Sequence, residues 1–363
     1  MNDLRTGYTT GTCAAAAARA ATQVLCGNRP PENSAVELPD GEQAVLPVEY
    51  ARRSGECAEA AVRKDAGDDP DVTDGVLIVV RACWNEGGDI EFEGGEGVGT
   101  VTRPGLQVEP GEPAINPVPR KMIRAAVREV TDRPVRLTVS VPGGEELAEE
   151  TFNPRLGIEG GISILGTSGR VRPFSCPALR QSLACAIDVA VAAGVRTPVL
   201  VPGHVGERAA RRHLDLENEQ IIPVSNEWGY MLDRLAEEDF DRFVALGHPG
   251  KMAKLASGHW DTHSSRSPSA VPIVMELARE LEVPAEEQNT TEGIFADLPP
   301  AQARRLGDAL AAEVLEAVDE RTEHSFQPAV MLVNMEGELL GTAGNVEIRM
   351  RNEESKVRMR NEE

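Results

Sequence analysis

The chain has 363 residues, of which 41% are hydrophobic and 4% aromatic, so it is long enough for two domains with aliphatic cores. Its net charge of -22 excludes a typical nucleic-acid binder, because affinity for phosphate comes from lysine and arginine. No run of about 18 apolar residues occurs, so we expect no membrane span, and the first residues lack the pattern of a signal peptide, which predicts a cytoplasmic protein.

The first half of the chain is expected to form an α+β domain. A threonine- and glycine-rich stretch leads into Cys13 and a series of alanines, which predicts a capped, tightly packed helix within residues 5–27. Alternating apolar residues predict strands at 35–38, 44–48, 76–81 and 135–141, with a helix at 120–130 and a glycine-rich loop at 94–99. Grouped strands with few helices indicate an α+β domain over residues 1–160.

The second half alternates short apolar runs with helical stretches. Apolar runs at 162–165, 198–201, 221–224 and 243–246 each end in a glycine-bearing turn that leads into a helical stretch. This order is typical of βαβ units, so we predict a C-terminal α/β domain over 161–345 with a doubly wound, Rossmann-like parallel sheet. Helices at 271–281 and 301–318 and a hairpin at 330–340 complete it. The charged repeat at 346–363 predicts a disordered tail.

The four turns after these runs predict a ligand site. In open α/β sheets, ligands bind outside the carboxyl ends of the strands. Glycine lets the backbone approach a ligand closely, and the following helix offers free N–H groups. Any single turn of this kind has a structural explanation as well, but four in succession favour a small ligand at this edge of the sheet.

A polar cluster at 247–264 holds three of the six histidines and two of the five lysines. Lys251 and Lys254 are three residues apart after a strand, so both can face an anion. His259, Asp261 and His263 alternate, so their side chains share one face in extended backbone. These three residues suit acid–base or substrate contacts. A metal site and plain loop structure stay open, although three ligands on one short segment rarely complete a coordination sphere.

Other features carry weaker signals. The six cysteines form no CxxC pair, so we expect neither a zinc site nor a disulfide framework, and most of them suit small buried hydrophobes. The Gly95-x-Gly97-x-Gly99 loop does not lead into a helix, which favours a structural or ligand-facing β-loop over a dinucleotide site. Arginines beside proline or glycine suit carboxylate recognition, or equally a cap or salt bridge; they are Arg103, Arg120 and Arg172.

The high acidic content has its own hypothesis. The acidic residues are spread along the chain, and a dense carboxylate surface stays hydrated in concentrated salt, which screens its self-repulsion. We therefore hypothesise a halophilic protein from a high-salt cytoplasm. Equal stability at low ionic strength and in molar salt would contradict this.

Several long motifs in order resemble the cobalt-precorrin-5B C1-methyltransferase family (CbiD) of the anaerobic route to cobalamin. They lie at 4–16, 64–73, 94–106, 110–120, 153–172 and 247–264, so the resemblance covers nearly the whole chain, to about residue 345. The resemblance implies transfer of a methyl group from S-adenosylmethionine to carbon 1 of cobalt-precorrin-5B, which gives cobalt-precorrin-6A. The substrate is an anionic cobalt tetrapyrrole, so cobalt enters only with the substrate and no metal site of the protein's own is expected.

This implied reaction assigns roles to the residues above. For the catalytic group we expect His259, Asp261 and His263. For the S-adenosylmethionine site, which no motif locates, we expect Gly166, Thr167, Ser168, Gly169, Gly203, Gly206 and Asn226. For substrate binding we expect Thr10, Thr12, Arg103, Asn116, Arg120, Arg172, Lys251 and Lys254.

Two other functions stay open at this point. One is an NAD(P)-dependent oxidoreductase that uses the same sheet edge, although the GxGxxG turn and the acidic ribose partner are missing. The other is a non-enzymatic tetrapyrrole-binding protein. Binding of S-adenosylmethionine, of NAD(P)H or of neither separates the three. We make no prediction of the oligomeric state.

Overall fold

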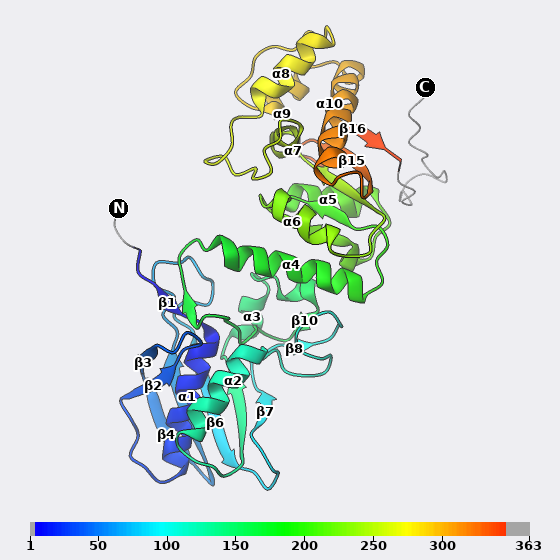
Figure 1. The fold of residues 1–363 in the computed structure, drawn as a ribbon. Helices are drawn as coiled ribbons and strands as arrows, with labels where there is room; N and C mark the ends of the chain where they lie inside the picture. Colours follow the sequence, from blue (N-terminus) through cyan, green and yellow to red (C-terminus); the bar gives the residue numbers. More distant parts are fainter. Residues whose placement is uncertain (1–3, 346–363) are drawn as a thin grey trace. The chain divides into compact units, whose positions relative to one another are not determined.

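The computed structural model describes residues 4–345 and divides the chain into two compact units (Figure 1). Unit 1 is Met1–Ala178 and unit 2 is Leu179–Glu363. The division therefore falls further along the chain than the boundary expected near residue 160. The predicted tail at 346–363 lies outside the described residues. Within the described part of the chain, no helix is long and apolar enough to cross a membrane.

A five-stranded sheet forms the centre of unit 1, in the order β4-β5-β6-β9-β7. Neighbouring strands are antiparallel except β9 and β7, which are parallel. The strands are β4 (Tyr50–Ser54), β5 (Cys57–Arg63), β6 (Leu77–Trp84), β9 (Val135–Ser140) and β7 (Glu91–Gly94). β6 and β9 confirm two predicted strands. β4 and β5 were not predicted, because alanine and charged residues dominate them and have low β propensity.

Smaller strand pairs and several helices complete this unit. The other two predicted strands form a separate hairpin, β2 (Asn33–Glu37) and β3 (Gln43–Pro47). The remaining strands form two-residue pairs: β1 (Gly7–Tyr8) with β11 (Arg170–Val171), and β8 (Thr100–Val101) with β10 (Ile158–Glu159). The helices α1 (Thr10–Leu25) and α2 (Pro117–Arg128) confirm the two expected ones, and a short helix, α3 (Gly144–Ala148), follows β9.

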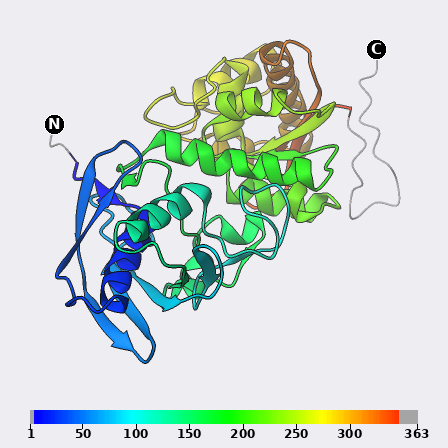
Figure 2. The same cartoon turned by 60° about the horizontal axis from the view of Figure 1, so that its bottom comes forward.

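The alanines of α1 explain how it packs. The helix lies against α2, β5 and β6 (Figures 1 and 2). All of its alanines are fully buried, and small side chains allow this close approach. Thr9 caps the helix, because its Oγ1 accepts a hydrogen bond from the Thr12 N–H at 3.2 Å. The capped, tightly packed helix predicted from the sequence is therefore confirmed.

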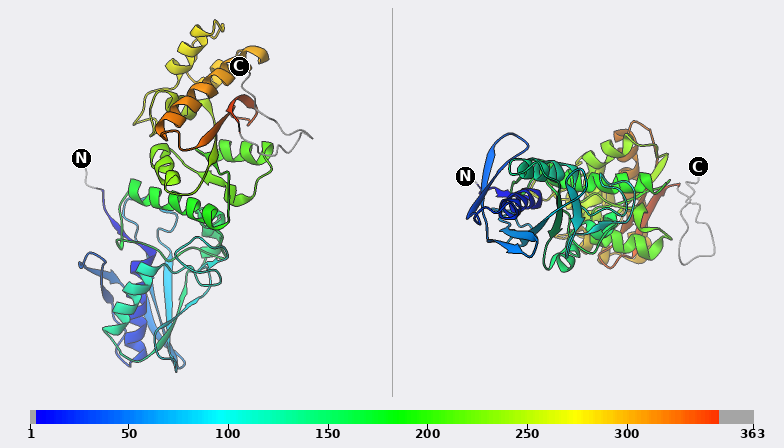
Figure 3. Two further views of the ribbon diagram at one scale, coloured as in Figure 1. Left: turned by 45° about the vertical axis from the view of Figure 1, so that its right-hand side comes forward. Right: turned by 90° about the horizontal axis from the view of Figure 1, so that it is seen from below.

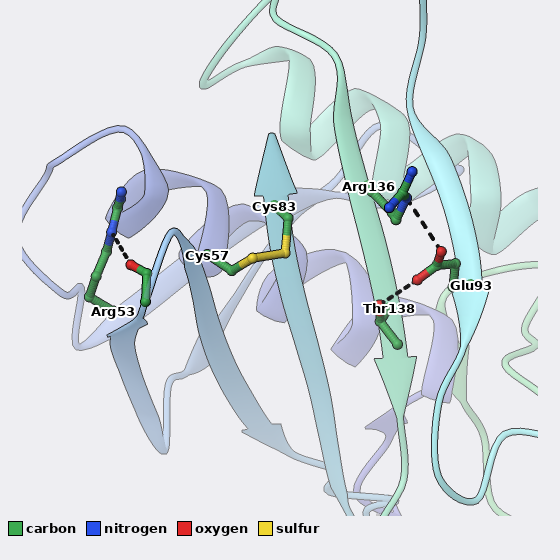
Figure 4. Close-up of a disulfide and its surroundings, with 7 residues drawn as sticks. Arg53, Cys57, Cys83, Glu93, Arg136 and Thr138 are labelled. Carbon is green, nitrogen blue, oxygen red and sulfur yellow. Dashed lines mark hydrogen bonds and ion pairs between the residues drawn. A yellow bond between two sulfur atoms is a disulfide. The ribbon is translucent and has the colours of Figure 1, made fainter. Parts of the chain in front are cut away.

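A disulfide joins Cys57 in β5 to Cys83 in β6 (Figure 4). Ala58 pairs with Ala82 across these strands, so the preceding and following residues, Cys57 and Cys83, face each other. The expectation that the cysteines form no disulfide was wrong for this pair. Cys13 does behave as a small buried hydrophobe, and burial raises the pKa of its thiol to about 12.

Unit 2 is built on a mixed sheet in the order β13-β12-β14-β15-β16. The first four strands are parallel and β16 is antiparallel to β15. The strands are β12 (Val199–Val201), β13 (Ile221–Pro223), β14 (Arg242–Gly247), β15 (Gln327–Val333) and β16 (Leu339–Gly344). Three predicted apolar runs are therefore parallel strands here. The fourth, 162–165, lies in unit 1, where Ile162 and Ile164 make only single bridges, to Val98 and Ile115. Its assignment to this sheet was wrong.

Helices alternate with these strands. α5 (His204–His213), α6 (Trp228–Ala236) and α7 (Pro249–Ala256) follow β12, β13 and β14 in turn. The others are α4 (Cys176–Ala192), α8 (Val271–Glu280), α9 (Thr291–Ala296) and α10 (Pro300–Arg321). Figure 3 shows α10 lying along β15 and β16. The chain is therefore a mixed α/β protein with parallel and antiparallel sheets.

The strand order places a reversal at the centre of the unit 2 sheet. The chain leaves β12 for β13 on one side, and β14 lies on the other side of β12. The loops after β12 and β14 therefore run in opposite directions from adjacent carboxyl ends. Such a switch point is the usual ligand position in open α/β sheets.

Candidate functional site

Three turns meet at the carboxyl edge of the unit 2 sheet. They follow β12 at Pro202 and Gly203, β13 at Ser225 and Asn226, and β14 at His248. Four turns were expected at this edge, but only three lie on this sheet. The fourth, at 166–169, belongs to unit 1. Ser225 has a φ of 54°, a left-handed conformation that is uncommon outside glycine and is often found at functional sites.

Lys251 connects the three turns. It lies in the first turn of α7, after β14, and its Nζ donates to the carbonyl oxygens of Pro202 at 2.9 Å and Ser225 at 3.5 Å. The side chain is half-buried, and no carboxylate of the described residues forms an ion pair with it. Burial, and then the neighbouring Lys254 ammonium, hold the pKa of Lys251 below its ordinary value of 10.5. This un-neutralised charge at the switch point suits an anionic ligand.

The lowered pKa of Lys251 predicts a pH dependence. Lys251 loses its proton at a lower pH than an exposed lysine, so its attraction for an anionic ligand weakens as the pH rises towards that pKa. In Lys251→Arg the charge persists to a pH above about 12, so the loss of affinity moves to higher pH. KM measured against pH for both proteins checks this. Superimposable profiles would show that Lys251 does not contact the ligand.

The three cofactor-site residues predicted in this unit differ in their surroundings. Gly203 is exposed and has a φ of 161°, which is extended backbone, and a Cβ there would meet no atom within 4 Å. A Cβ on Gly206 would lie 2.8 Å from the Leu246 carbonyl oxygen, so Gly206 allows α5 to pack on β14. The Asn226 Oδ1 accepts from the Thr262 hydroxyl at 3.2 Å. Gly203 is therefore the residue whose backbone is open to a ligand.

The predicted catalytic trio lies beyond α7. The Asp261 carboxylate forms an ion pair with Arg266 at 2.5 Å and accepts from the His263 N–H at 3.1 Å. The exposed His263 ring bonds to the Ser265 hydroxyl through Nδ1 at 2.8 Å. His259 is half-buried, and its N–H bonds to the Lys254 carbonyl. Much of the hydrogen-bonding capacity of Asp261 and His263 is therefore used within this loop. Among the described residues, no group of three or more His, Cys, Asp or Glu could hold a metal ion.

Two buried charges hold the same loop in place. Lys254 is 5% exposed, and its Nζ donates to the Thr262 carbonyl at 3.1 Å and the Ser267 hydroxyl at 2.9 Å. Glu227 is also buried, and it accepts from Arg180 at 2.6 Å and from Arg266 at 3.4 Å. Lys254 therefore positions the loop rather than pointing at an anion beside Lys251.

A histidine–carboxylate pair at this edge was not predicted. The Gly250 N–H donates to His248 Nδ1 at 3.0 Å, which places the ring proton on Nε2, 2.8 Å from Glu292 Oε2. Glu292 in turn accepts from the Met335 N–H at 3.3 Å. The pair therefore ties α9 and the β15–β16 turn to the start of α7. His248 and Glu292 are 44 residues apart, so no sequence motif indicates that they pair.

In unit 1, the predicted threonines fasten α1 to the segment that contains Gly166, Thr167, Ser168 and Gly169. The Thr10 hydroxyl donates to the Ser163 carbonyl at 3.2 Å and accepts from the Leu165 N–H at 2.9 Å. The Thr12 hydroxyl donates to the Gly169 carbonyl at 2.6 Å. Gly166 has a φ of 131°, and a Cβ there would lie 2.4 Å from the Thr9 hydroxyl. Both hydroxyls therefore have structural partners.

The remaining predicted residues of unit 1 divide into packed and exposed side chains. Arg120 donates to the Ile115 carbonyl at 2.7 Å and to Glu112 at 3.2 Å, and Arg103 packs against Gly157. Asn116 precedes α2 without capping it through its side chain. Arg172 is exposed. Arg172 is therefore the predicted arginine most open to an anionic ligand.

Comparison with known proteins identifies one family. A family model described as CbiD matches residues 1–173, and one described as CbiD, C-terminal domain, matches residues 261–344. A cobalt-precorrin-5B C(1)-methyltransferase of Syntrophotalea carbinolica is 55% identical over 347 residues, which cover 95% of this chain and 99% of the relative. The protein of the same name from Moorella thermoacetica is 44% identical over 354 residues, covering 94% of this chain and 95% of that protein.

One solved structure also matches. It is the crystal structure of the cobalamin biosynthesis protein cbiD from Archaeoglobus fulgidus, which is 30% identical and covers 76% of this chain and 84% of that chain, with a TM-score of 0.39.

Proposed function

The chain belongs to the CbiD family, and we propose that this cobalt-precorrin-5B C1-methyltransferase binds its methyl donor at the carboxyl edge of the unit 2 sheet. The enzyme methylates carbon 1 of cobalt-precorrin-5B in cobalamin biosynthesis. We further propose that the donor is S-adenosylmethionine and that unit 2 is a doubly wound, Rossmann-like domain. The observation that carries the proposal is the meeting of three turns and Lys251 at the switch point.

The residues at this edge fit such a donor. S-adenosylmethionine would supply an electrophilic methyl group on a sulfonium. Its carboxylate suits the Lys251 ammonium, and its polar groups suit the Asn226 side chain and the open backbone at Gly203. Carboxylates of the tetrapyrrole also suit the Lys251 ammonium. In unit 1, the exposed guanidinium group of Arg172 suits a carboxylate as well. Methyl transfer to carbon depends mainly on aligning donor and acceptor, so these residues would act chiefly by positioning.

Substitution of Gly203 tests the donor site without disturbing the fold. A valine side chain has open space and an allowed backbone conformation there, so we expect an unchanged unfolding midpoint. The same side chain would occupy the ligand position, so we expect the Kd for S-adenosylhomocysteine to rise by at least about 10-fold, or about 1.4 kcal/mol. Titration calorimetry on Gly203→Val checks this, with Gly88→Val as a matched control, since Gly88 also has open space.

The same titrations address the two other functions. Tight binding of NAD(P)H in place of S-adenosylhomocysteine would contradict the donor proposal and favour an oxidoreductase. Binding of neither would favour a non-catalytic tetrapyrrole-binding protein. An unchanged Kd in Gly203→Val would show that the donor does not bind at this turn.

A role for the predicted trio is part of the proposal, with His259 in the acid–base or substrate contact and the other two residues in support. The half-buried His259, with no side-chain hydrogen bond within the described residues, is the member best placed to take up a proton or steady the macrocycle. Asp261 and His263 act by shaping the loop. Substitution of each residue by alanine tests this. Full turnover in all three variants would show that none of the three residues takes part in the reaction.

We also propose that the enzyme works in a high-salt cytoplasm, because its net charge is -22. Salt screens repulsion among exposed carboxylates, so the unfolding temperature should rise by several degrees between about 0.1 M and 1 M potassium chloride. Thermal unfolding monitored by circular dichroism checks this. An unfolding temperature that does not change with salt concentration would contradict the halophilic hypothesis.

A further inference from the structure

Residues 165–174, here called the strap, have a backbone that is fixed at several points. The Leu165 carbonyl accepts from the Gly11 N–H at 3.0 Å, and the Gly169 carbonyl accepts from the Thr9 N–H at 3.1 Å. The next two residues form β11, which pairs with β1. At its end, the Phe174 N–H donates to Asp69 Oδ1 at 2.9 Å. The strap is therefore a preorganised segment on the surface of unit 1.

The side chains of the strap are exposed although its backbone is held. Leu165 is 47% exposed and Phe174 is 71% exposed, the highest value among the large hydrophobic residues that stand out on the surface. Arg172, two residues before Phe174, is also exposed, and no carboxylate of the described residues pairs with it. The strap therefore offers apolar side chains and a guanidinium group to the solvent.

Phe174 combines exposure with backbone strain. Its φ of 54° lies in the left-handed region, which a bulky residue rarely adopts. A phenylalanine at such a position usually gains stability from burial, but this ring is largely in solvent. Asparagine or glycine would fit the backbone better, so the fold does not explain the aromatic ring. Strain of this kind at an exposed position points to a ligand.

We infer that Phe174 is a platform for the flat, conjugated face of the cobalt-tetrapyrrole substrate, and that Arg172 pairs with one of its carboxylates. The inference rests on the proposed function, which supplies a ligand that is both planar and anionic. An aromatic ring stacks on a conjugated face, and a guanidinium group binds a carboxylate through paired hydrogen bonds. Phe174 is therefore a specificity-determining residue for the macrocycle and not for the methyl donor.

The test separates binding from folding. Phe174→Asn removes the ring, and asparagine adopts the left-handed backbone conformation more readily than phenylalanine. The unfolding temperature of this variant should therefore equal or exceed that of the unsubstituted protein. Its Kd for cobalt uroporphyrin, a stable polycarboxylate tetrapyrrole, should rise by about 10-fold, as expected for a lost stacking contact. Phe174→Tyr keeps the ring and should keep the affinity. Arg172→Gln should weaken binding at low salt and have a smaller effect at high salt.

Three results would overturn the inference. Phe174→Asn with unchanged affinity for cobalt uroporphyrin would show that the ring does not touch the macrocycle. A fall of several degrees in its unfolding temperature would show that the ring has a packing role. Self-association that is lost in Phe174→Asn, measured by analytical ultracentrifugation, would make the ring a contact between copies of this chain.

Methyl transfer distinguishes this inference from the proposed function. If the unsubstituted protein methylates cobalt-precorrin-5B and Phe174→Asn has the same KM, the inference fails and the function stands. If the unsubstituted protein binds cobalt uroporphyrin through Phe174 but transfers no methyl group, the platform stands and the function fails.

Discussion

Replacement of Lys251 by methionine is expected to lower kcat/KM for methyl transfer by about 100-fold, or about 2.7 kcal/mol of transition-state binding. Methionine matches the length of the lysine stem and removes the charge together with the N–H donors to Pro202 and Ser225. The ammonium touches two backbone carbonyls and no carboxylate of the described residues, so its charge is available to an anionic ligand. A charge-assisted hydrogen bond in a half-buried position is worth this much because water screens it poorly.

A matched control separates this effect from a change in overall charge. Lys121 is exposed on α2 of unit 1, and Lys121→Met removes the same charge from a helix that carries none of the turns of the proposed site, so its kcat/KM should be unchanged. Lys251→Arg should recover part of the activity, because the charge is retained. Full activity in Lys251→Met would refute the assignment of Lys251 to ligand binding. Unfolding of this variant at room temperature would instead reveal a structural role, which Lys251→Arg would then rescue.

Loss of the disulfide is the largest effect that we expect on stability. Joining Cys57 to Cys83 closes a loop with a sequence separation of 26 residues in the unfolded chain. A loop of this length restricts the unfolded state by about 3.5 kcal/mol, so Cys57→Ala/Cys83→Ala should lower the free energy of unfolding of unit 1 by about that amount. Denaturant unfolding with and without a reductant provides the measurement.

The expected pattern has an internal control. A reductant should destabilise the unsubstituted protein and leave the double variant unchanged, because the described part of the chain holds no other disulfide. Cys26→Ala removes an exposed cysteine outside the disulfide and should have no such effect. If the reductant changed neither the midpoint nor the slope for the unsubstituted protein, the two thiols would not be joined in solution.

The sequence was sufficient for elements that have a strong local pattern. The alanine series after the threonine cap predicted α1, because alanine has the highest helix propensity and a helix that is apolar on all sides is buried. Three strand–turn–helix units of unit 2 were also predicted, since each apolar run is bounded by a glycine turn. The run at 162–165 has the same pattern, yet it extends a loop of unit 1 and joins no sheet of several strands. Local pattern does not determine which unit an apolar run joins.

Contacts between distant segments account for most of what was missed. Cys57 was not paired with Cys83 because β5 is rich in alanine and was not predicted as a strand. His248 lay within the predicted polar cluster, but its partner Glu292 is 44 residues away with no motif around it. Lys251 was predicted to bind an anion from its rarity and position. The carbonyls that hold its ammonium at the switch point depend on strand order, which spacing does not reveal.

Lys254 shows how a correct pattern can mislead about a role. Its spacing from Lys251 suggested a pair facing one anion, but the two ammonium groups have different partners. Lys254 points into the protein, where Thr262 and Ser267 accept its hydrogen bonds. A three-residue spacing places two residues on neighbouring parts of a helix, and packing then decides which of them is buried.

Methyl transfer from S-adenosylmethionine that carries a deuterated methyl group tests the central claim most directly. With cobalt-precorrin-5B as acceptor, we predict a product that carries the heavy methyl group at carbon 1, identified by mass spectrometry and NMR, and a loss of this product in Gly203→Val and Lys251→Met. A protein that binds both ligands and forms no labelled product would contradict the account. Undiminished labelling in both variants would contradict the placement of the site.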